Sequence, residues 1–277
     1  MRKATKSILA IAAASSLIAC GQVRGKSQPE ASAEILRDTC VTFSSGSTFG
    51  KWLSDKILEH PFSEEDFYDA SGERQSDFDL SFTIDESGDM SGIRIKHTDS
   101  TDTSGYSNVQ KYLISLLEDA PAWNPAVSEG VRISTPMSLN VRIMPYEKAY
   151  ETIYSRFDTS SKRQIPYKEG QNYVMVSSLF RYGTHNDMMR WISENIKYPE
   201  EARKKKIEGK VYVCGLLDSL GRLRDLKTMD APGFSDNALL ADSALKTLAA
   251  MPQQDPYYEN GHPMEITFAI PLVFKAE

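Results

Sequence analysis

Histidines, cysteines, serines and glycine-rich loops would carry most catalytic or ligand-binding chemistry in this 277-residue chain. No His-x-x-x-His zinc signature and no Cys-x-x-Cys pair occurs among them; the four histidines are His60, His97, His185 and His262. Residues 46–51 have three residues between their glycines where a phosphate-binding loop has four, and Trp52 replaces the hydroxyl residue of such a loop. No serine lies in a Gly-x-Ser-x-Gly elbow. We therefore predict no catalytic, metal or cofactor site. An unrecognised hydrolase is kept as an alternative, after the two non-enzymatic functions given at the end of this subsection.

The composition is that of a folded protein with no affinity for nucleic acid. Hydrophobic residues make up 40% and charged residues 25% of the chain, which are ordinary globular values. The formal net charge is -6, and the longest run of basic residues is short, from Arg203 to Lys206. Because phosphate backbones are bound by basic patches, nucleic acid is excluded as an expected partner.

The amino terminus has the pattern of an exported, lipid-anchored protein. Arg2, Lys3 and Lys6 precede an uncharged, mostly apolar run, residues 7–19, which is too short to span a bilayer but suits a signal peptide. The end of this run, Leu17-Ile18-Ala19-Cys20, resembles the lipobox of bacterial lipoproteins, which implies cleavage before Cys20 and acylation of that residue. An ordinary secretory peptide is the alternative. We expect attachment through lipid to the periplasmic face of the outer membrane, within the cell envelope.

Two cysteines remain once Cys20 carries lipid. Cys40 and Cys214 form an even pair in an oxidising compartment, so a disulfide between them is one prediction. The alternative is two separate buried thiols, because a bridge requires a short Cα separation.

The chain contains the same pattern of elements twice. Alternating strands at 78–84 and 90–95 flank the turn from Asp85 to Gly88, and strands at 211–217 and 223–228 flank the turn from Asp218 to Gly221 at the same spacing. Here both aspartates are expected to be turn residues. In the first copy, the outward-pointing residues of the first strand are polar. In the second copy, the residues at the matching positions are Tyr212, Cys214 and Leu216. The second sheet is therefore expected to be covered on both faces, with 173–182, 35–43, the other module or a partner as candidate covers.

Each hairpin is preceded and followed by a helix. Apolar residues recur every fourth position after each hairpin, at Val109, Leu113 and Leu117 and again at Leu240, Ala244 and Leu248. Prolines and a glycine at matching spacing then lead into a third strand in both copies. The predicted fold class is α+β, with two tandem αββαβ modules, each a three-stranded antiparallel sheet with helices packed on one face.

The predicted boundaries follow from this pattern. They are a lipoprotein signal peptide at 1–19, a lipidated tether at 20–46, a first module at 47–146, an inter-module segment at 147–183 and a second module at 184–277. The inter-module segment contains a helical pattern around Tyr150 to Phe157 and a stretch rich in β-forming residues from Tyr173 to Tyr182. Packing between the modules is the expected role of this segment, and a separate binding surface is the alternative.

The second module resembles a known family. Its Tyr198-Pro199-Glu200-Glu201-Ala202-Arg203 helix, its Gly209-Lys210-Val211-Tyr212-Val213 strand and its Pro271-Leu272-Val273-Phe274 strand look like the TonB carboxy-terminal domain. The first module resembles the same domain more distantly, since residues 62–64 depart from the helix motif. This resemblance implies a non-enzymatic module that captures an extended segment of an outer-membrane receptor. The transmembrane helix and proline-rich spacer of energy transducers are replaced here by the lipobox, so partner binding is expected without energy transduction.

The third strand of each module is the predicted docking edge. A strand at a sheet edge can accept an extended peptide through its backbone, and the resemblance points to this strand. The candidate edges are 138–143 and 268–274, and the second is favoured, although Pro271 lacks a donor that Asn140 retains at the matching position. Predicted partner-binding residues are Thr267, Phe268, Ala269, Ile270, Leu272 and Phe274.

The sequence therefore predicts a lipoprotein that binds an outer-membrane receptor or a periplasmic protein, with a link to TonB-dependent transport. The alternative is a structural lipoprotein whose modules only self-associate, for example as a homodimer.

Overall fold

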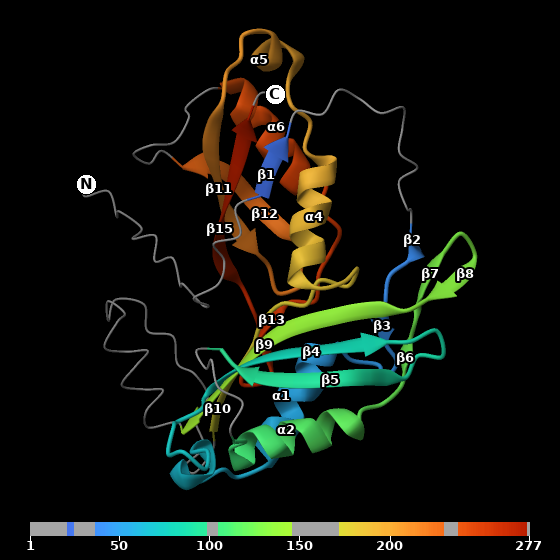
Figure 1. Cartoon of the computed structure of the whole chain (residues 1–277), viewed down its shortest axis with the longest axis vertical. Coiled ribbons are helices and arrows are strands. Elements are labelled where there is room, and N and C mark those ends of the chain that lie inside the picture. Colours follow the sequence, from blue (N-terminus) through green and yellow to red (C-terminus); the bar gives the residue numbers. More distant parts are fainter. Residues whose placement is uncertain (1–20, 25–36, 99–104, 146–171, 230–237, 276–277) are drawn as a thin grey trace, which may run out of the picture. The chain divides into compact units, whose positions relative to one another are not determined.

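A computed structural model describes residues 21–24, 37–98, 105–145, 172–229 and 238–275 (Figure 1). The chain forms two compact units. The central unit comprises residues 35–185 and 254–264, and the carboxy-terminal unit comprises 1–34, 186–253 and 265–277. Cys20, the expected signal peptide and the expected helix at 150–157 lie outside the described residues.

The central unit is built on a six-stranded antiparallel sheet in the order β14-β13-β10-β9-β4-β5. Its strands are β4 (Asp77–Ile84), β5 (Met90–His97), β9 (Thr135–Pro145), β10 (Asn172–Val176), β13 (Tyr257–Glu259) and β14 (His262–Met264). Smaller sheets join β2 (Arg37–Thr39) to β7 (Ala126–Ser128) and β8 (Val131–Ile133), and β3 (Thr42–Phe43) to β6 (Trp123–Asn124). The helices are α1 (Phe49–Glu59), the short 3₁₀ helix η1 (Glu64–Phe67) and α2 (Asn108–Glu118).

Helices α1 and α2 cover one face of this sheet. The side chain of Thr48 caps α1 by accepting from the Lys51 N–H, and Ser107 caps α2 in the same way. Both helices bury their apolar stripes against β4, whose alternate residues share one core with them; in α2 these are the predicted Val109, Leu113 and Leu117. Helix α2 runs beside β5 (Figure 1). The opposite face of β4 is polar, as the alternation predicts.

The carboxy-terminal unit has a four-stranded sheet in the order β1-β15-β11-β12. Its elements are β1 (Gly21–Arg24), α4 (His185–Asn195), α5 (Glu200–Lys204), β11 (Gly209–Leu217), β12 (Leu223–Met229), α6 (Ala238–Ala249) and β15 (Ile266–Lys275). The first residue of α4, His185, is assigned to the central unit. Helix α6 packs on β11 and β12. Its buried Leu240, Ala244 and Leu248 share a core with alternate residues of β11 and β15. Among the helices that the structure describes, none combines the length and apolarity needed to cross a membrane.

The α+β class is confirmed, and the predicted hairpins recur with the same irregularities. The β4–β5 ladder shifts register between Ser81 and Thr83, and the β11–β12 ladder shifts between Cys214 and Leu216. Each turn ends in a glycine with positive φ, Gly88 or Gly221. That the first set of elements is also related to the TonB family remains a prediction.

The predicted boundary between the modules is crossed in the structure. Hairpin β13–β14, which the sequence assigned to module 184–277, lies in the sheet of the central unit. Strand β10, from the inter-module segment, lies between this hairpin and β9. The reason is backbone pairing, because β10 satisfies the outer edge of β9 and then offers its own second edge to β13.

Candidate docking edge

Strand β15 has one neighbour along its whole length and a short one on its other side. All ten of its residues except Lys275 are paired antiparallel with β11, from Leu217 opposite Ile266 to Gly209 opposite Phe274. On the outer side β1 runs parallel and pairs with residues 272–275. The outer side of β15 therefore accepts an extended segment.

The direction of each backbone group on β15 follows from its equivalent strand in the central unit. There Asn140 of β9 lies opposite Asp79, as Pro271 of β15 lies opposite Tyr212. The Asn140 N–H donates to the Ser177 hydroxyl at 2.8 Å and its carbonyl accepts from the Ser177 N–H at 2.9 Å, so both groups point away from β4. Pro271 by equivalence points its nitrogen away from β11, where a proline interrupts no hydrogen bond between β11 and β15.

Alternation extends this assignment along the strand. Residues that share the phase of Pro271 direct their N–H and C=O groups to the outer edge, and the residues between them direct these groups to β11. The outward set is Thr267, Ala269, Pro271, Val273 and Lys275. Four of these five supply an N–H, and the gap at Pro271 leaves only a carbonyl acceptor at that position.

The structure separates the six predicted binding residues into two groups. Ile270, Leu272 and Phe274 are buried in the core of the carboxy-terminal unit, and Phe268 packs against that core. Thr267 is exposed and Ala269 is half-buried, and only these two belong to the outward phase. Three outward residues are absent from the predicted six: Pro271, Val273 and Lys275. The phase set by Pro271 was the feature of the sequence that could have identified them.

The other predicted docking edge, 138–143, is wrong. Strand β10 pairs with β9 there, with Val176 opposite Val141 and Val174 opposite Ile143. In addition the Ser138 hydroxyl accepts from the His185 N–H at 3.0 Å. The backbone of this edge is therefore used inside the central unit, by a strand from outside the predicted module.

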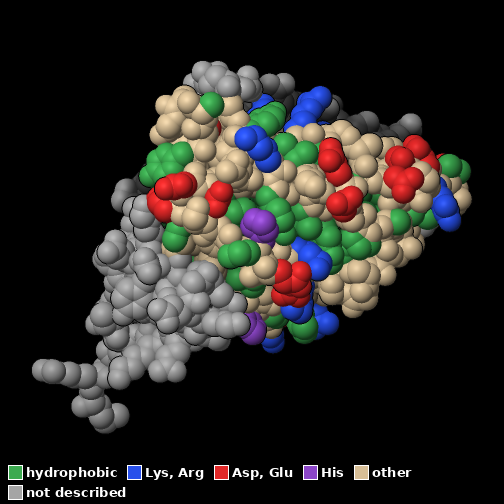
Figure 2. Space-filling view, turned by 90° about the horizontal axis from the view of Figure 1, so that it is seen from below, with side chains coloured by type: hydrophobic (Ala, Val, Ile, Leu, Met, Phe, Trp, Pro, Cys, Tyr) green, Lys and Arg blue, Asp and Glu red, His purple; other side chains and the backbone are tan. Residues whose placement is uncertain are grey.

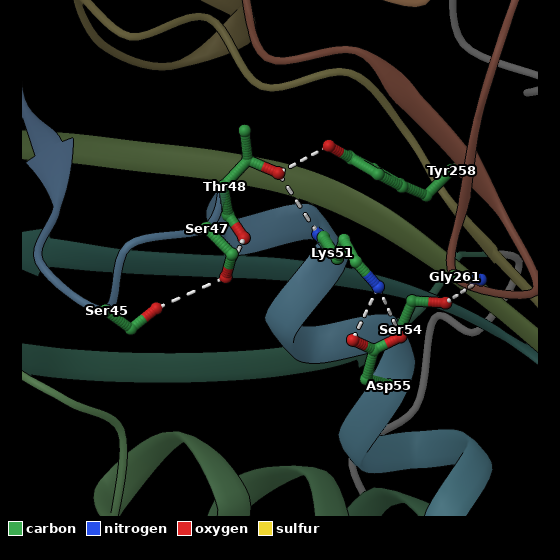
Figure 3. Close-up of polar contacts among 8 residues, drawn as sticks. All are labelled: Ser45, Ser47, Thr48, Lys51, Ser54, Asp55, Tyr258 and Gly261. Carbon is green, nitrogen blue, oxygen red and sulfur yellow. Dashed lines mark hydrogen bonds and ion pairs between the residues drawn. The ribbon is translucent and has the colours of Figure 1, made fainter.

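The β13–β14 hairpin, which completes this sheet, is held against α1 by hydrogen bonds and close packing, called the clasp below (Figure 3). The Thr48 hydroxyl and the Tyr258 hydroxyl are 2.5 Å apart, and the Gly261 N–H donates to the Ser54 hydroxyl at 2.8 Å. A Cβ on Gly50 would lie 2.8 Å from the Tyr258 ring, so glycine allows the hairpin its close approach to the helix. The clasp makes the occupied edge of β9 a fixed part of the central unit.

A buried ion pair reinforces the same region. Arg181 Nε lies 2.5 Å from Asp255 Oδ1, and the Asp255 N–H donates to the Leu179 carbonyl. Burial raises the pKa of the Asp255 carboxyl, and Arg181 offsets only part of this effect. Burial also lowers the pKa of His185, whose Nε2 is buried without a hydrogen-bond partner. Both groups lie beside the occupied edge and take part in packing.

The hairpin aspartates are turn residues, as predicted. A hydrogen bond from the Ser87 side chain, together with backbone N–H groups, lowers the pKa of Asp85. Backbone N–H groups, foremost that of Arg222, lower the pKa of Asp218. Within the described residues no group of three or more His, Cys, Asp or Glu side chains could hold a metal ion. Acidic and basic side chains are interspersed on the face shown in Figure 2, with no continuous basic band.

Cys40 and Cys214 are both free thiols, and they lie in different units. Cys214 is buried on the outer face of β11, with its sulfur 3.5 Å from the Lys227 carbonyl, while its neighbours Tyr212 and Leu216 are half-buried. Cys40 is half-buried. The disulfide between them remains a prediction.

Residues 194–276 match the model of the family described as the Gram-negative bacterial TonB protein C-terminal. This segment is therefore similar to the TonB C-terminal family. It contains most of the carboxy-terminal unit, including all of β15, and also β13 and β14. The TonB-like segment is therefore shared between the two units.

Among solved structures, the chain is similar to the NMR solution structure of the Helicobacter pylori TonB C-terminal domain. The sequence identity is 23%, the match covers 32% of this chain and 78% of that chain, and the TM-score is 0.27. No curated protein matches the chain.

Proposed function

We propose that this protein is a non-enzymatic cell-envelope lipoprotein that binds an outer-membrane or periplasmic protein by strand addition to the outer edge of β15. The observation that supports the proposal is the pairing of β1, an extended segment, with residues 272–275 on this edge. Main-chain hydrogen bonds would supply affinity, and side chains at alternate positions of the bound segment would supply selectivity. The similarity of residues 194–276 to the TonB C-terminal family agrees with binding of envelope proteins and with a role in TonB-dependent transport.

The sheet edges formed by β12 and β5 are less suited to this role. Strand β12 exposes Arg224, Asp225 and Lys227, and β5 exposes Arg94 and Lys96. Exposed charges on a sheet edge disfavour strand addition. The ladders of both strands also contain a register shift, which bends an edge away from regular pairing. The outward set of β15 has a single charged residue, at its end.

The lipid anchor is part of the proposal. Acylation of Cys20 would attach the chain to the membrane at the residue immediately before β1. A partner strand that binds residues 272–275 would replace β1 and release the tether between the anchor and the rest of the chain. The anchor would therefore hold the docking edge close to the membrane surface in which an outer-membrane partner is embedded.

Cross-linking in cells followed by mass spectrometry tests the proposal by identifying the partner, and substitution of Ala269 tests the edge. Ala269→Pro removes one outward N–H, and Ala269→Ser keeps it at the same position. We expect about fivefold weaker capture of the cross-linked partner by Ala269→Pro and no change for Ala269→Ser, since one lost hydrogen bond is worth about 1 kcal/mol. Equal capture by the two folded variants would exclude strand addition at this position.

A further inference from the structure

The central unit shows what a permanent occupant of the third strand looks like. Strand β10 pairs antiparallel with β9, and the residue that follows β10, Ser177, faces Asn140. The pair exchanges two hydrogen bonds, from the Asn140 N–H to the Ser177 hydroxyl and from the Ser177 N–H to the Asn140 carbonyl. Behind it, β10 pairs with the hairpin β13–β14.

A second three-stranded group of the same kind exists in the chain. Strand β2 pairs with the hairpin β7–β8 as β10 pairs with β13–β14. Thr39 lies opposite Val127 as Val176 lies opposite Tyr258, and the ladder of β2 shifts register between Thr39 and Arg37, which lies opposite Ser128. Among the described strands β2 pairs with β7 alone, so its second edge corresponds to the edge through which β10 binds β9.

The segment after β2 matches the segment after β10 residue by residue. Cys40 aligns with Ser177, Phe43 with Phe180, and Gly46 with Gly183 at a constant offset. Both glycines have positive φ. The bridge between Thr42 and Asn124 also has its counterpart in the bridge between Leu179 and Asp255. Cys40 is therefore the equivalent of Ser177, and Pro271 is the equivalent of Asn140.

These two replacements are complementary. In the central unit Asn140 supplies an N–H and Ser177 supplies the hydroxyl that accepts it. Pro271 has no N–H, and the Cys40 thiol is a weak acceptor in place of a hydroxyl. A pair formed by Cys40 and Pro271 would leave neither a buried donor nor a strong acceptor unsatisfied, and the Cys40 N–H could still donate to the Pro271 carbonyl.

We propose that a second copy of this chain binds the edge of β15 through its own β2, with Cys40 opposite Pro271 and Thr39 opposite Leu272. Strand β2 would run antiparallel to β15, as β10 does to β9, and would replace β1 at residues 272–275. The two surfaces differ, so the association is head to tail and extends beyond a dimer. The inference rests on the docking edge of the proposed function and identifies one of its ligands.

Disulfide trapping tests this register in the full-length protein expressed in cells. Pro271→Cys in a Cys214→Ser background leaves Cys40 as its facing thiol, because opposite residues of an antiparallel pair lie within the Cα separation of a disulfide. We expect a ladder of disulfide-linked dimers and larger species on non-reducing gels. Mass spectrometry should identify a peptide pair in which Cys40 is bonded to the cysteine introduced at position 271. The matched control with Cys40→Ser should lose the ladder.

A second pair of substitutions controls for geometry. Asn140→Cys combined with Ser177→Cys places thiols at the equivalent positions of the central unit, where an intrachain bond should form. If this bond forms while Cys40 and the thiol introduced at position 271 give no bond, or give a bond only within one chain, binding of a second copy is wrong. Sedimentation of the parent protein supplies a readout without cysteine variants, and a mass that does not rise with concentration would also contradict the proposal.

The same cells separate this inference from the proposed function. Capture of an envelope protein that depends on Ala269, without a ladder, would contradict the second-copy inference and leave the proposed function intact. A ladder without capture would support the inference and contradict binding of another envelope protein. Loss of both would remove the docking edge of β15 altogether.

Discussion

The direction of the β15 amides gives a stability prediction that needs no partner. Ala269 lies in the outward phase, and Ile270 lies in the phase that faces Val213 of β11. Proline at position 269 should therefore leave the β11–β15 ladder intact, as Pro271 already does. Proline at position 270 should remove a ladder hydrogen bond and force the two strands apart.

The expected free energies differ clearly. Ala269→Pro should change the free energy of unfolding by no more than about 1 kcal/mol, because no protein hydrogen bond to β11 is lost. Ile270 is 8% exposed, so truncation to alanine alone costs about 2 to 4 kcal/mol. Ile270→Pro should cost about 3 kcal/mol more than Ile270→Ala, which isolates the backbone effect from the lost side chain.

Hydrogen–deuterium exchange across a urea series, followed in peptides of β11, measures this difference for the carboxy-terminal unit by itself. Parent protein is the reference for position 269, since alanine is its native residue, and Ile270→Ala is the reference for position 270. If the two prolines cost the same beyond their references, or position 269 costs more, the assigned phase is wrong. The docking edge would then be formed by the residues that this phase assigns to β11.

Three further predictions concern the rest of the chain. Gly88→Ala should lower the free energy of unfolding by about 3 kcal/mol or more, and Gly72→Ala by about 1 kcal/mol, as measured by thermal unfolding. Both glycines have positive φ, but only at Gly88 would an added Cβ lie 2.0 Å from a backbone oxygen, that of Trp123. Equal losses of stability in the two variants would contradict this contact. Burial raises the pKa of Asp255, so the free energy of unfolding of the parent, taken relative to that of Asp255→Asn, should fall as pH rises from below 3.8 through the raised folded-state pKa. A slope unchanged in that variant would assign the titration to another group. Cys20→Ser should abolish incorporation of labelled fatty acid, and a labelled variant would exclude this residue as the lipid attachment site.

Local patterns in the sequence predicted the hairpins and helices closely. The alternation at 78–84 and 90–95 appears as β4 and β5, and the turn between them has the expected glycine with positive φ. These features depend on neighbours within a few residues, so the sequence states them directly. The four-residue spacing of Leu240, Ala244 and Leu248 likewise predicted the buried face of α6.

Long-range pairing was not predictable in the same way. The resemblance to an edge-binding family made 138–143 one of two candidate edges. The strand that closes it lies beyond a long segment, and the β-forming residues noted at 173–182 do not indicate which strand they pair with. The six predicted binding residues on β15 include members of both phases, although backbone groups alternate in direction along a strand. The register of β15 with β11 became available only from the structure.

The difference between the two third strands explains how one design can give a fixed contact and an exchangeable one. On β9 the occupant β10 is held by the Asn140–Ser177 pair and by its own hairpin, which α1 clasps through Tyr258 and Gly261. On β15 the occupant β1 spans four residues, and Pro271 removes the donor that Asn140 supplies. Each missing hydrogen bond lowers the stability of an occupant by about 0.5 to 1.5 kcal/mol. Under the proposed function, an edge weakened in this way would release its own chain segment at low cost, as a docking site must before it binds another strand.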